Sequence, residues 1–465
     1  MTQELAHPDH ILDAMELDTA RTVIAPATAM AAGYGPSARA HGAAGDVAAR
    51  LARFRAAAGR ATPPARVRSA APSPGPDRAA RLADALGGDV ERSAEGRVVR
   101  VVASRPLPVA FERLAALPYP VDPGHPLVCL DTETTGLGTA AGTVAFLVGL
   151  GRWDGERFDV IQLVLPDHPD EPAFLAALRA AIPPDAWLVT YNGKGFDWPL
   201  LVTRFRLQRS AAPVHAGHLD LLPVARQLWR HRLDDARLAT VERGVAGVLR
   251  PDDLPGALVP ARYLEFLRTG AAEPLRAVIE HNRQDVVSLG LLLAHLLGRL
   301  ADPASREREP AGDVAALGRA YARRRRFDEA LACCDAAVSR APDERQHEVL
   351  AAERARVLRL AGRRRDSANA WLDIATAQGA LAAVAWVQFA KYLEHSAGDP
   401  ASALEATERA SALVERQRAV GRDLPRLQHD LARRRERLRR RMAGISRRTV
   451  PPAGAPGSAP GPEPR

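Results

Sequence analysis

Four carboxylates and one histidine stand in three short blocks far apart in the chain, and together they suit metal-dependent hydrolysis of phosphodiesters. The carboxylates are Asp131, Glu133, Asp197 and Asp285, and the histidine is His281. Two divalent cations about 4 Å apart require several carboxylates, because hard cations prefer oxygen ligands. The sequence therefore predicts that the four carboxylates hold two Mg²⁺ or Mn²⁺ ions. His281 is the candidate general base that accepts the proton of the attacking water.

The first block follows a predicted strand. Residues 126–130 form a short apolar run, and the polar residues begin at Asp131. Side chains alternate along a strand, so Asp131 and Glu133 are expected on the same face. Residues 134–138 contain two glycines, which end the strand and allow the backbone to approach a ligand closely.

The other two blocks also lie at the ends or faces of predicted elements. Residues 186–191 predict a second strand, followed by a glycine-rich turn and a helix with Asp197 near its N-terminus. Residues 275–293 predict a long amphipathic helix. Within it, His281 and Asp285 are four residues apart and therefore share one face.

These blocks resemble the three motifs of the DEDD (DnaQ-like) 3′–5′ exonucleases, which have a ribonuclease H-like fold. More specifically, they are similar to YprB-type ribonuclease H-like proteins over roughly residues 120–300. The similarity rests on Asp-Thr-Glu-Thr-Thr-Gly-Leu at 131–137, Tyr-Asn-Gly-Lys-Gly-Phe-Asp at 191–197, His-Asn-x-x-Asp at 281–285, and Arg-Pro-Asp-Asp-Leu-Pro-Gly at 250–256. One difference concerns the histidine, which lies four residues before the last aspartate. The usual family patterns have histidine five residues before it or tyrosine four before it.

The resemblance implies a 3′–5′ exonuclease that acts on single-stranded DNA or RNA by a two-metal mechanism. Residues of the first two motifs are then expected to bind the terminal nucleotide, namely Thr132, Thr135, Tyr191, Asn192, Lys194 and Phe196. The alternative is a catalytically inactive nuclease fold that serves as an adaptor for nucleic acid or protein partners.

Two further residues near the second block each allow two interpretations. Lys194 is one of only two lysines among 64 basic residues, so it could be a compact phosphate contact or a chance retention. Asp220, at the end of a predicted strand over 218–221, could be a carboxylate beside the site or an N-cap.

Length and composition restrict the class of protein. A chain of 465 residues suggests two or three domains. Three cysteines cannot form a disulfide framework, which indicates a reducing compartment. We find no apolar run of 18 residues and no secretory signal at the N-terminus. The sequence therefore predicts a cytoplasmic protein without a membrane span.

The positive charge is concentrated near the C-terminus. The whole chain has a net charge of +9, and residues 415–448 contain 13 Arg against 4 Asp or Glu, a difference of 13 − 4 = +9. Such a run either binds nucleic acid phosphates or forms a solvated helix end.

The order of predicted elements is that of an α/β ribonuclease H-like domain. Three consecutive strands over 127–132, 143–150 and 157–165 predict an antiparallel meander, and alternating strands and helices follow. We therefore expect a mixed five-stranded sheet flanked by helices, within a nuclease domain over 86–305 whose motif core is 125–300. Residues 1–85, rich in Ala, Pro and Arg, are predicted to be mostly disordered, apart from a short helix over 12–23.

The rest of the chain predicts an all-α region. Residues 311–442 are rich in alanine, and the spacing of Leu317, Tyr321, Ala330, Ala337 and Pro342 matches a tetratricopeptide repeat. Two fainter repeats follow, and such a stack would offer a surface for a protein partner. The alternative is that these helices only cover the nuclease domain. The tail over 443–465 is predicted to be disordered.

Overall fold

The computed structural model describes residues 77–119, 121–136, 142–250 and 254–449, with side chains to residue 443. The helix predicted over 12–23 and the tail from residue 450 lie outside these residues. So do Leu137 of the first motif, Gly138 after it, and residues 251–253 of the stretch 250–256 that resembles the family. No helix in the described part of the chain is both long and apolar enough to cross a membrane.

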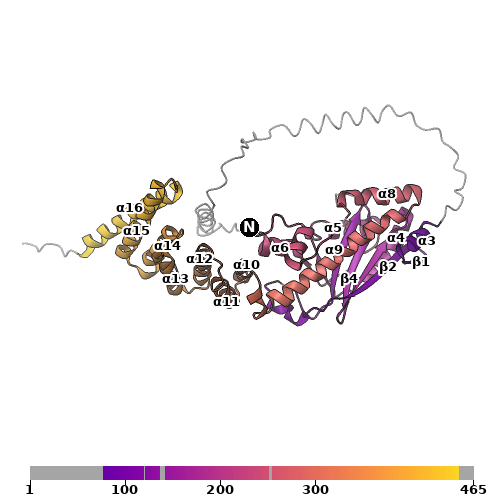
Figure 1. Cartoon of the computed structure of the whole chain (residues 1–465), viewed down its shortest axis with the longest axis horizontal. Helices are drawn as coiled ribbons and strands as arrows, with labels where there is room; N and C mark the ends of the chain where they lie inside the picture. The colour runs from indigo at the N-terminus through magenta and orange to yellow at the C-terminus, as the bar shows by residue number, and fades with distance from the viewer. Residues whose placement is uncertain (1–76, 120, 137–141, 251–253, 450–465) are drawn as a thin grey trace, which may run out of the picture. The chain divides into compact units, whose positions relative to one another are not determined.

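A mixed seven-stranded sheet forms the centre of the first domain (Figure 1). Its order is β1-β2-β5-β4-β3-β6-β7. β6 runs parallel to its neighbours β3 and β7, and the other pairs are antiparallel. The strands are β1 (Asp89–Ser93), β2 (Gly96–Pro106), β3 (Leu127–Thr134), β4 (Ala145–Asp154), β5 (Arg157–Val164), β6 (Trp187–Thr190) and β7 (Gly217–Asp220).

The sheet has two strands more than the five that the sequence predicted. The two additional strands are β1 and β2, which form a hairpin before the meander, and β2 pairs with β5 from Val99–Val164 to Pro106–Arg157. The long β2 extends the meander, and its buried residues Val98 and Val99 join one of the two hydrophobic cores of the domain.

Helices cover both faces of this sheet. They are α3 (Arg78–Leu86), α4 (Glu171–Ala181), α5 (Asp197–Leu207), α6 (Leu221–Trp229), α7 (Leu238–Val241), α8 (Val259–Thr269) and α9 (Arg276–His295). Helix α3 begins inside the segment that was predicted to be mostly disordered. The helices and the sheet enclose two hydrophobic cores. Strand β3 contributes to both because its side chains alternate: Cys129 belongs to one core, and Val128 and Leu130 belong to the other.

The C-terminal region is entirely helical, as predicted. Its helices are α10 (Ala311–Arg323), α11 (Phe327–Val338), α12 (Glu344–Leu360), α13 (Arg364–Thr376), α14 (Ala382–Tyr392), α15 (Pro400–Ala419) and α16 (Pro425–Thr449), and each contacts the next. Ala330, Cys334 and Ala337 are buried, so the helices can pack closely. This arrangement fits helical repeats, and the tetratricopeptide assignment stays a prediction.

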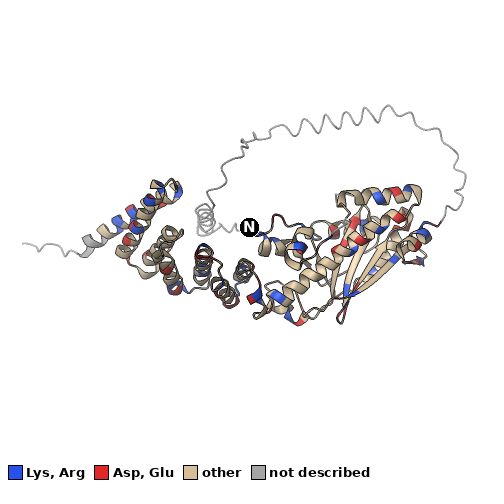
Figure 2. Ribbon diagram, in the orientation of Figure 1, with Lys and Arg blue, Asp and Glu red and all other residues tan. Residues whose placement is uncertain are grey.

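The last helix corrects the prediction that the chain is disordered from residue 443. Helix α16 continues to Thr449, and Leu431 and Leu438 are buried. Basic residues are frequent on this helix (Figure 2). Two of them, Arg434 and Arg437, contact the buried Glu394 at 2.7 and 2.8 Å. The arginine run is therefore part of a packed helix and not a frayed end.

Candidate active site

Strand β3 carries the first pair of carboxylates at the centre of the sheet. Asp131 and Glu133 are partly exposed, whereas Thr132 and Thr134 are buried, as alternation along a strand predicts. The register with β4 shifts between Glu133 and Thr134, so the strand ends in a bulge directly after the acidic pair. Thr135 then closes the loop, because its hydroxyl accepts a hydrogen bond from the Val144 N–H at 3.0 Å.

Helix α9 brings the third block to these carboxylates. The Asn282 amide donates to the Asp131 carboxylate at 2.8 Å. Asn282 is fully buried, and its own carbonyl accepts a hydrogen bond from Gln162 of β5 at 2.9 Å. The helix can approach this closely because β4 has Gly149 there: a Cβ at that position would lie 2.3 Å from the Asn282 oxygen.

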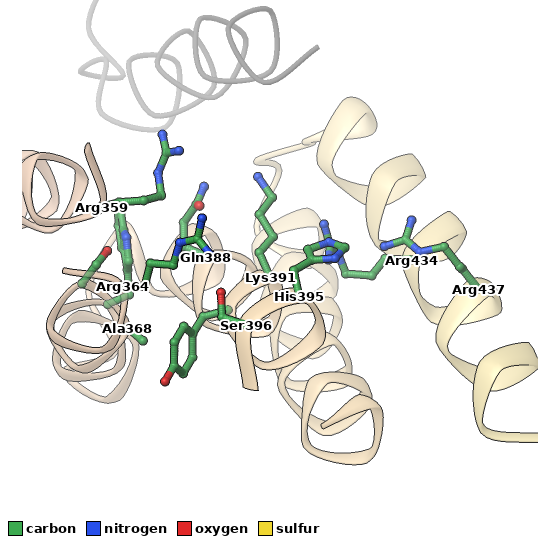
Figure 3. Close-up of a pocket in the computed structure, with 12 residues that line it drawn as sticks. Arg359, Arg364, Ala368, Gln388, Lys391, His395, Ser396, Arg434 and Arg437 are labelled. Atoms are coloured by element: carbon green, nitrogen blue, oxygen red, sulfur yellow. The ribbon is translucent and has the colours of Figure 1, made fainter. Parts of the chain in front are cut away.

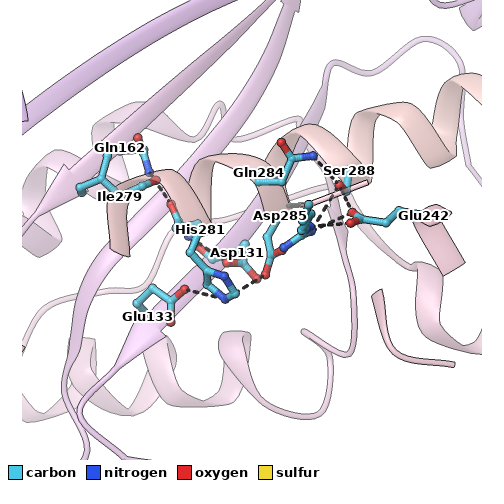
Figure 4. Close-up of polar contacts among 11 residues, drawn as sticks. Asp131, Glu133, Gln162, Glu242, Ile279, His281, Gln284, Asp285 and Ser288 are labelled. Carbon is cyan, nitrogen blue, oxygen red and sulfur yellow. Dashed lines mark hydrogen bonds and ion pairs between the residues drawn. The ribbon is translucent and has the colours of Figure 1, made fainter. Parts of the chain in front are cut away.

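His281 lies between two carboxylates from different blocks (Figure 4). Its Nε2 is 3.8 Å from Glu133 Oε1 and 3.9 Å from Asp285 Oδ2. The side chains of the three residues are between 13% and 19% exposed, so water can reach them. An imidazole in this position can take a proton from a water molecule that lies against both carboxylates.

Asp285 also forms an ion pair with Arg250, the first residue of the stretch 250–256. Arg250 Nη2 is 2.6 Å from Asp285 Oδ1 and 2.7 Å from Glu242 Oε2. Glu242 is buried in a π-helical turn and accepts a hydrogen bond from Ser288, one turn after Asp285 on α9. Arg250 therefore connects Asp285 to a second, buried acid, and its guanidinium neutralises part of the negative charge at Asp285.

Asp197 is held at β3 by a different contact. It begins α5, and its carboxylate accepts a hydrogen bond from the Thr132 hydroxyl. Thr132 lies between Asp131 and Glu133 in the sequence of β3, but by alternation its side chain points to the other face of the strand, where Asp197 meets it. The turn before α5 depends on the identity of two residues. Asn192 has a φ of 66°, which asparagine tolerates, and Gly193 leaves room for Thr190, because a Cβ at position 193 would lie 2.5 Å from that side chain.

Asp220 at the end of β7 fixes this turn. Its carboxylate accepts the Asn192 N–H at 2.8 Å and the Lys194 N–H at 3.2 Å. It also accepts the Leu222 N–H at 3.0 Å and thereby caps α6. Both interpretations from the sequence therefore apply, because Asp220 is an N-cap and also holds the second motif in place.

The predicted nucleotide-binding residues have different surroundings. The Tyr191 hydroxyl donates to the Ala236 carbonyl at 2.6 Å, which gives this side chain a structural contact away from the carboxylates. Thr132 and Thr135 are engaged in the contacts above, and Phe196 precedes α5 half-buried. Asn192 and Lys194 are exposed. Contact with a nucleotide remains a prediction for all six residues.

The pKa values of three site carboxylates are raised, chiefly by burial. The pKa of Asp131 lies well above its ordinary value because of burial and then of repulsion from Asp285, Asp197 and Glu133. Burial raises the pKa of Asp197 to about 6, and the hydrogen bond from Thr132 opposes this shift. Burial also raises the pKa of Asp285, although Arg250 lowers it. A bound cation would relieve the repulsion among these groups.

The side chains as they stand do not form a closed metal site. Among the residues that the structure describes, no three His, Cys, Asp or Glu side chains are arranged to hold one ion. Each acid has a partner within the chain: Asn282 for Asp131, His281 for Glu133, Thr132 for Asp197 and Arg250 for Asp285. The chemistry of the set still fits a divalent cation. Carboxylates are hard oxygen donors, and a cation would offset the repulsion that raises the pKa of Asp131.

Sequence reasoning missed the residues that support the acids. Gln162 and Glu242 gave no signal, since one lies within a strand and the other in a turn far from any motif. Asn282 and Arg250 belonged to stretches that resembled the family, but their contacts with Asp131 and Asp285 could not be inferred. These side chains bind across elements that only the folded chain brings together.

Comparisons with known proteins agree with this geometry. Residues 128–297 match the model of an RNase_H superfamily domain. The chain is also similar to the uncharacterized protein YprB of Bacillus subtilis (strain 168), with 32% identity over 285 residues, or 61% of this chain and 68% of that protein. The chain therefore belongs to the ribonuclease H superfamily and, within it, to the family of YprB.

Proposed function

We propose that this member of the YprB family is a 3′–5′ exonuclease that hydrolyses single-stranded DNA or RNA with two divalent cations, Mg²⁺ or Mn²⁺. Membership of the ribonuclease H superfamily supports a nuclease-type function. The observation that carries the finer proposal is the position of His281, within 4 Å of carboxylates from two distant blocks, beside the Asn282–Asp131 contact.

In the proposed reaction, water adds to phosphorus, the bond to the 3′ oxygen breaks, and that oxygen gains a proton. Asp131, Glu133, Asp197 and Asp285 would hold the two cations. When bound, such cations lower the pKa of water and stabilise the charge on the leaving oxygen. His281 Nε2 would accept the proton of the attacking water.

Other residues would hold the acids in place. Asn282 and Thr132 fix Asp131 and Asp197 by hydrogen bonds, which keeps the carboxylates near one another despite their repulsion. Arg250 must release or share Asp285 before that carboxylate can bind a cation, because one of its oxygens lies 2.6 Å from the guanidinium. Lys194 and Asn192, exposed on the second motif's turn, would contact the terminal nucleotide.

A second candidate function is that of an inactive adaptor. The contact between Arg250 and Asp285 favours it, because a guanidinium can take the place of a metal ion as the partner of a carboxylate. Such a protein would bind nucleic acid, or a protein on its helical region, without cleaving it.

One assay distinguishes the two functions. Single-stranded DNA and RNA, each labelled at the 5′ end or at the 3′ end, are incubated with the protein and Mg²⁺, Mn²⁺ or EDTA. A 3′–5′ exonuclease releases labelled mononucleotides at once from the 3′-labelled strand and shortens the 5′-labelled strand stepwise, only with metal. Binding without cleavage under all conditions would support the adaptor. The Asp131→Asn variant serves as the control against a contaminating nuclease.

A further inference from the structure

A pocket of about 490 Å³ lies beside the second motif and is lined by both the nuclease domain and the first helix of the helical region. The domain contributes Tyr119, Trp187, Lys194 and Asp220 among others, and the helical region contributes Arg323 at the end of α10 and Arg324 directly after it. None of Asp131, Glu133, Asp197 and Asp285 is among these lining residues, so the pocket is distinct from the carboxylate site. It adjoins that site through the turn that contains Lys194. A second pocket, between α13, α14 and α16 of the helical region (Figure 3), lies outside the nuclease domain.

Helix α10 is firmly attached to the nuclease domain. The buried Asp313 carboxylate binds Arg232 at 2.9 Å. The Tyr321 hydroxyl donates to the Ala116 carbonyl at 2.6 Å, and Arg326, just after α10, donates to the Leu117 carbonyl at 3.0 Å. The two arginines on the pocket therefore belong to a wall that is fixed against the domain.

The rim of the pocket is cationic. Lys194, Arg323 and Arg324 are all exposed, and in the described part of the chain Arg323 and Arg324 form no ion pair. The acid on this rim, Asp220, already accepts three backbone N–H groups, from the second motif's turn and α6. Three cations thus face one acid whose oxygens are occupied, which favours an anionic ligand.

The rest of the pocket is largely apolar and includes a fixed aromatic ring. Trp187 is half-buried, and a Cβ on Gly217 would lie 2.4 Å from its ring, so the glycine lets the strand pack directly on the indole. Pro118 and Pro223 also line the pocket. The Tyr119 hydroxyl is buried and has no hydrogen-bond partner among the described residues. A ring surface beside cations suits a base with its phosphate better than it suits an acidic peptide.

We propose that this pocket binds one nucleotide of a single-stranded nucleic acid, with the base against Trp187 and the phosphate at Lys194, Arg323 and Arg324. The inference rests on the proposed function, because it assigns that function a substrate subsite. It makes α10 part of substrate capture and gives the helical region a role beyond covering the domain.

The test measures binding without cleavage, so that it does not depend on nuclease activity. Fluorescence anisotropy of a labelled ten-nucleotide oligo-dT or oligo-U is recorded in EDTA at several salt concentrations. The variant is Arg323→Ala with Arg324→Ala. The matched control is Arg345→Ala with Arg365→Ala, because these two arginines are also exposed on the helical region but lie outside the pocket.

We expect the pocket variant to bind about tenfold more weakly and to lower the slope of log K against log salt by up to about 0.7, because the pocket is proposed to hold one phosphate and each phosphate that is neutralised on a single strand contributes about 0.7 to that slope. The control variant should match the wild type. Equal affinities and slopes for all three proteins would overturn the proposal. So would displacement of the oligonucleotide by oligo-glutamate of the same length at equal concentration, because the pocket would then select charge alone.

A second measurement locates the base. An oligonucleotide that contains 5-iodouracil is cross-linked by ultraviolet light, and the attached peptide is identified by mass spectrometry. A cross-link at Trp187 or Tyr119 supports the proposal, and one confined to α16 would overturn it. If the pocket variant loses affinity although no protein cleaves any strand, the proposed nuclease function fails and the pocket stands. If the wild type cleaves the strand and the pocket variant binds it unchanged, the proposed nuclease function stands and the pocket proposal fails.

Discussion

Buried acids have opposite surroundings in the two regions of the molecule. In the helical region, Asp313 binds Arg232 and His231, and Glu394 binds Arg434 and Arg437, so neighbouring cations lower the pKa of both acids. At the candidate site, the acids crowd one another. Burial raises the pKa values of Asp131, Asp197 and Asp285, and repulsion raises that of Asp131 further.

The difference separates acids that stabilise the fold from acids arranged for chemistry. A buried carboxylate that meets an arginine is satisfied within the chain and holds two elements together. Carboxylates that meet other carboxylates make folding less favourable, and such arrangements persist at functional sites. We therefore expect the candidate site to lower the stability of the chain when no cation is bound, and an added cation to restore it.

Neutralising an acid of the site should have the largest effect on activity. Asp131→Asn is expected to lower nuclease activity at least about 10⁴-fold, because it removes a proposed metal ligand. The free energy of unfolding, measured by urea denaturation without metal, should be unchanged or higher, because the substitution relieves repulsion from the neighbouring acids.

The matched control is Asp313→Asn in the helical region, which should lose stability and keep its activity. If Asp131→Asn instead unfolds more easily and still cleaves nucleic acid, the two regions do not differ as described. In that case Asp131 would be a structural residue, and its hydrogen bond with Asn282 would stabilise the packing of α9 on β3.

Removing the imidazole should have the next largest effect. We expect His281→Ala to lower the rate about 10²- to 10⁴-fold, the usual contribution of a general base, with metal affinity nearly constant. The measurements are single-turnover rates and a metal titration by calorimetry. A collapse of metal binding would instead identify His281 as a ligand, and the base would be another residue.

Removing a paired acid should affect stability and not chemistry. Asp313 is fully buried, and Arg232 donates to it at 2.9 and 3.1 Å. Asp313→Asn is therefore expected to cost about 2 kcal/mol at neutral pH, the usual value for a hydrogen bond to a charged group. Urea denaturation of the wild type and the variant measures this difference.

The difference in free energy of unfolding between the wild type and Asp313→Asn should decrease as the pH falls. The pKa of Asp313 is lowered in the folded protein from its ordinary value of 3.8. Its contribution is therefore complete above the unfolded pKa and is lost as pH falls through the lower, folded pKa. Wild type and variant should differ fully above about pH 5 and converge only as the pH falls below the lowered, folded pKa of Asp313. A difference that persists at low pH would show that the pairing with Arg232 is not its source.

Local patterns were sufficient to predict the elements that carry the acids. The helix predicted over 275–293 corresponds to α9, and β3, which carries Asp131 and Glu133, follows from one apolar run. Apolar alternation and glycine-rich turns act over a few residues, which is why they can be read from the sequence. The family resemblance then indicated which acids belong together, and it identified the ribonuclease H-like fold.

Contacts between distant elements could not be predicted in this way. The pairing of β2 with β5 depends on a hairpin 50 residues or more before its partner, so the sheet was expected to be narrower. Arg250 and Glu242 are eight residues apart, and they meet Asp285 and Ser288, respectively, only because α9 passes beside them. Similarly, the arginine run contained no sign that the buried Glu394 would bind two of its members.

The smallest effect is expected at the exposed arginines of α16. Truncating the chain after Leu413 would not test their role, because it removes the buried Val414, Leu431 and Leu438 together with the partners of Glu394. Arg433→Ala with Arg440→Ala keeps these contacts. We expect it to weaken binding of a long single strand by about two- to threefold and to leave binding of a ten-nucleotide strand unchanged.

The inner pair of arginines provides the contrast. Arg434→Ala with Arg437→Ala leaves Glu394 buried at 3% exposure without its two cations, so this variant should lower the free energy of unfolding, as a pair broken on one side does. The outer pair should leave it unchanged. Anisotropy with long and short strands, together with urea denaturation of both variants, separates the two effects. If the outer pair changed neither the affinity nor its dependence on salt, the exposed arginines would be a solvated helix face, and capture of the strand would depend on the nuclease domain and α10.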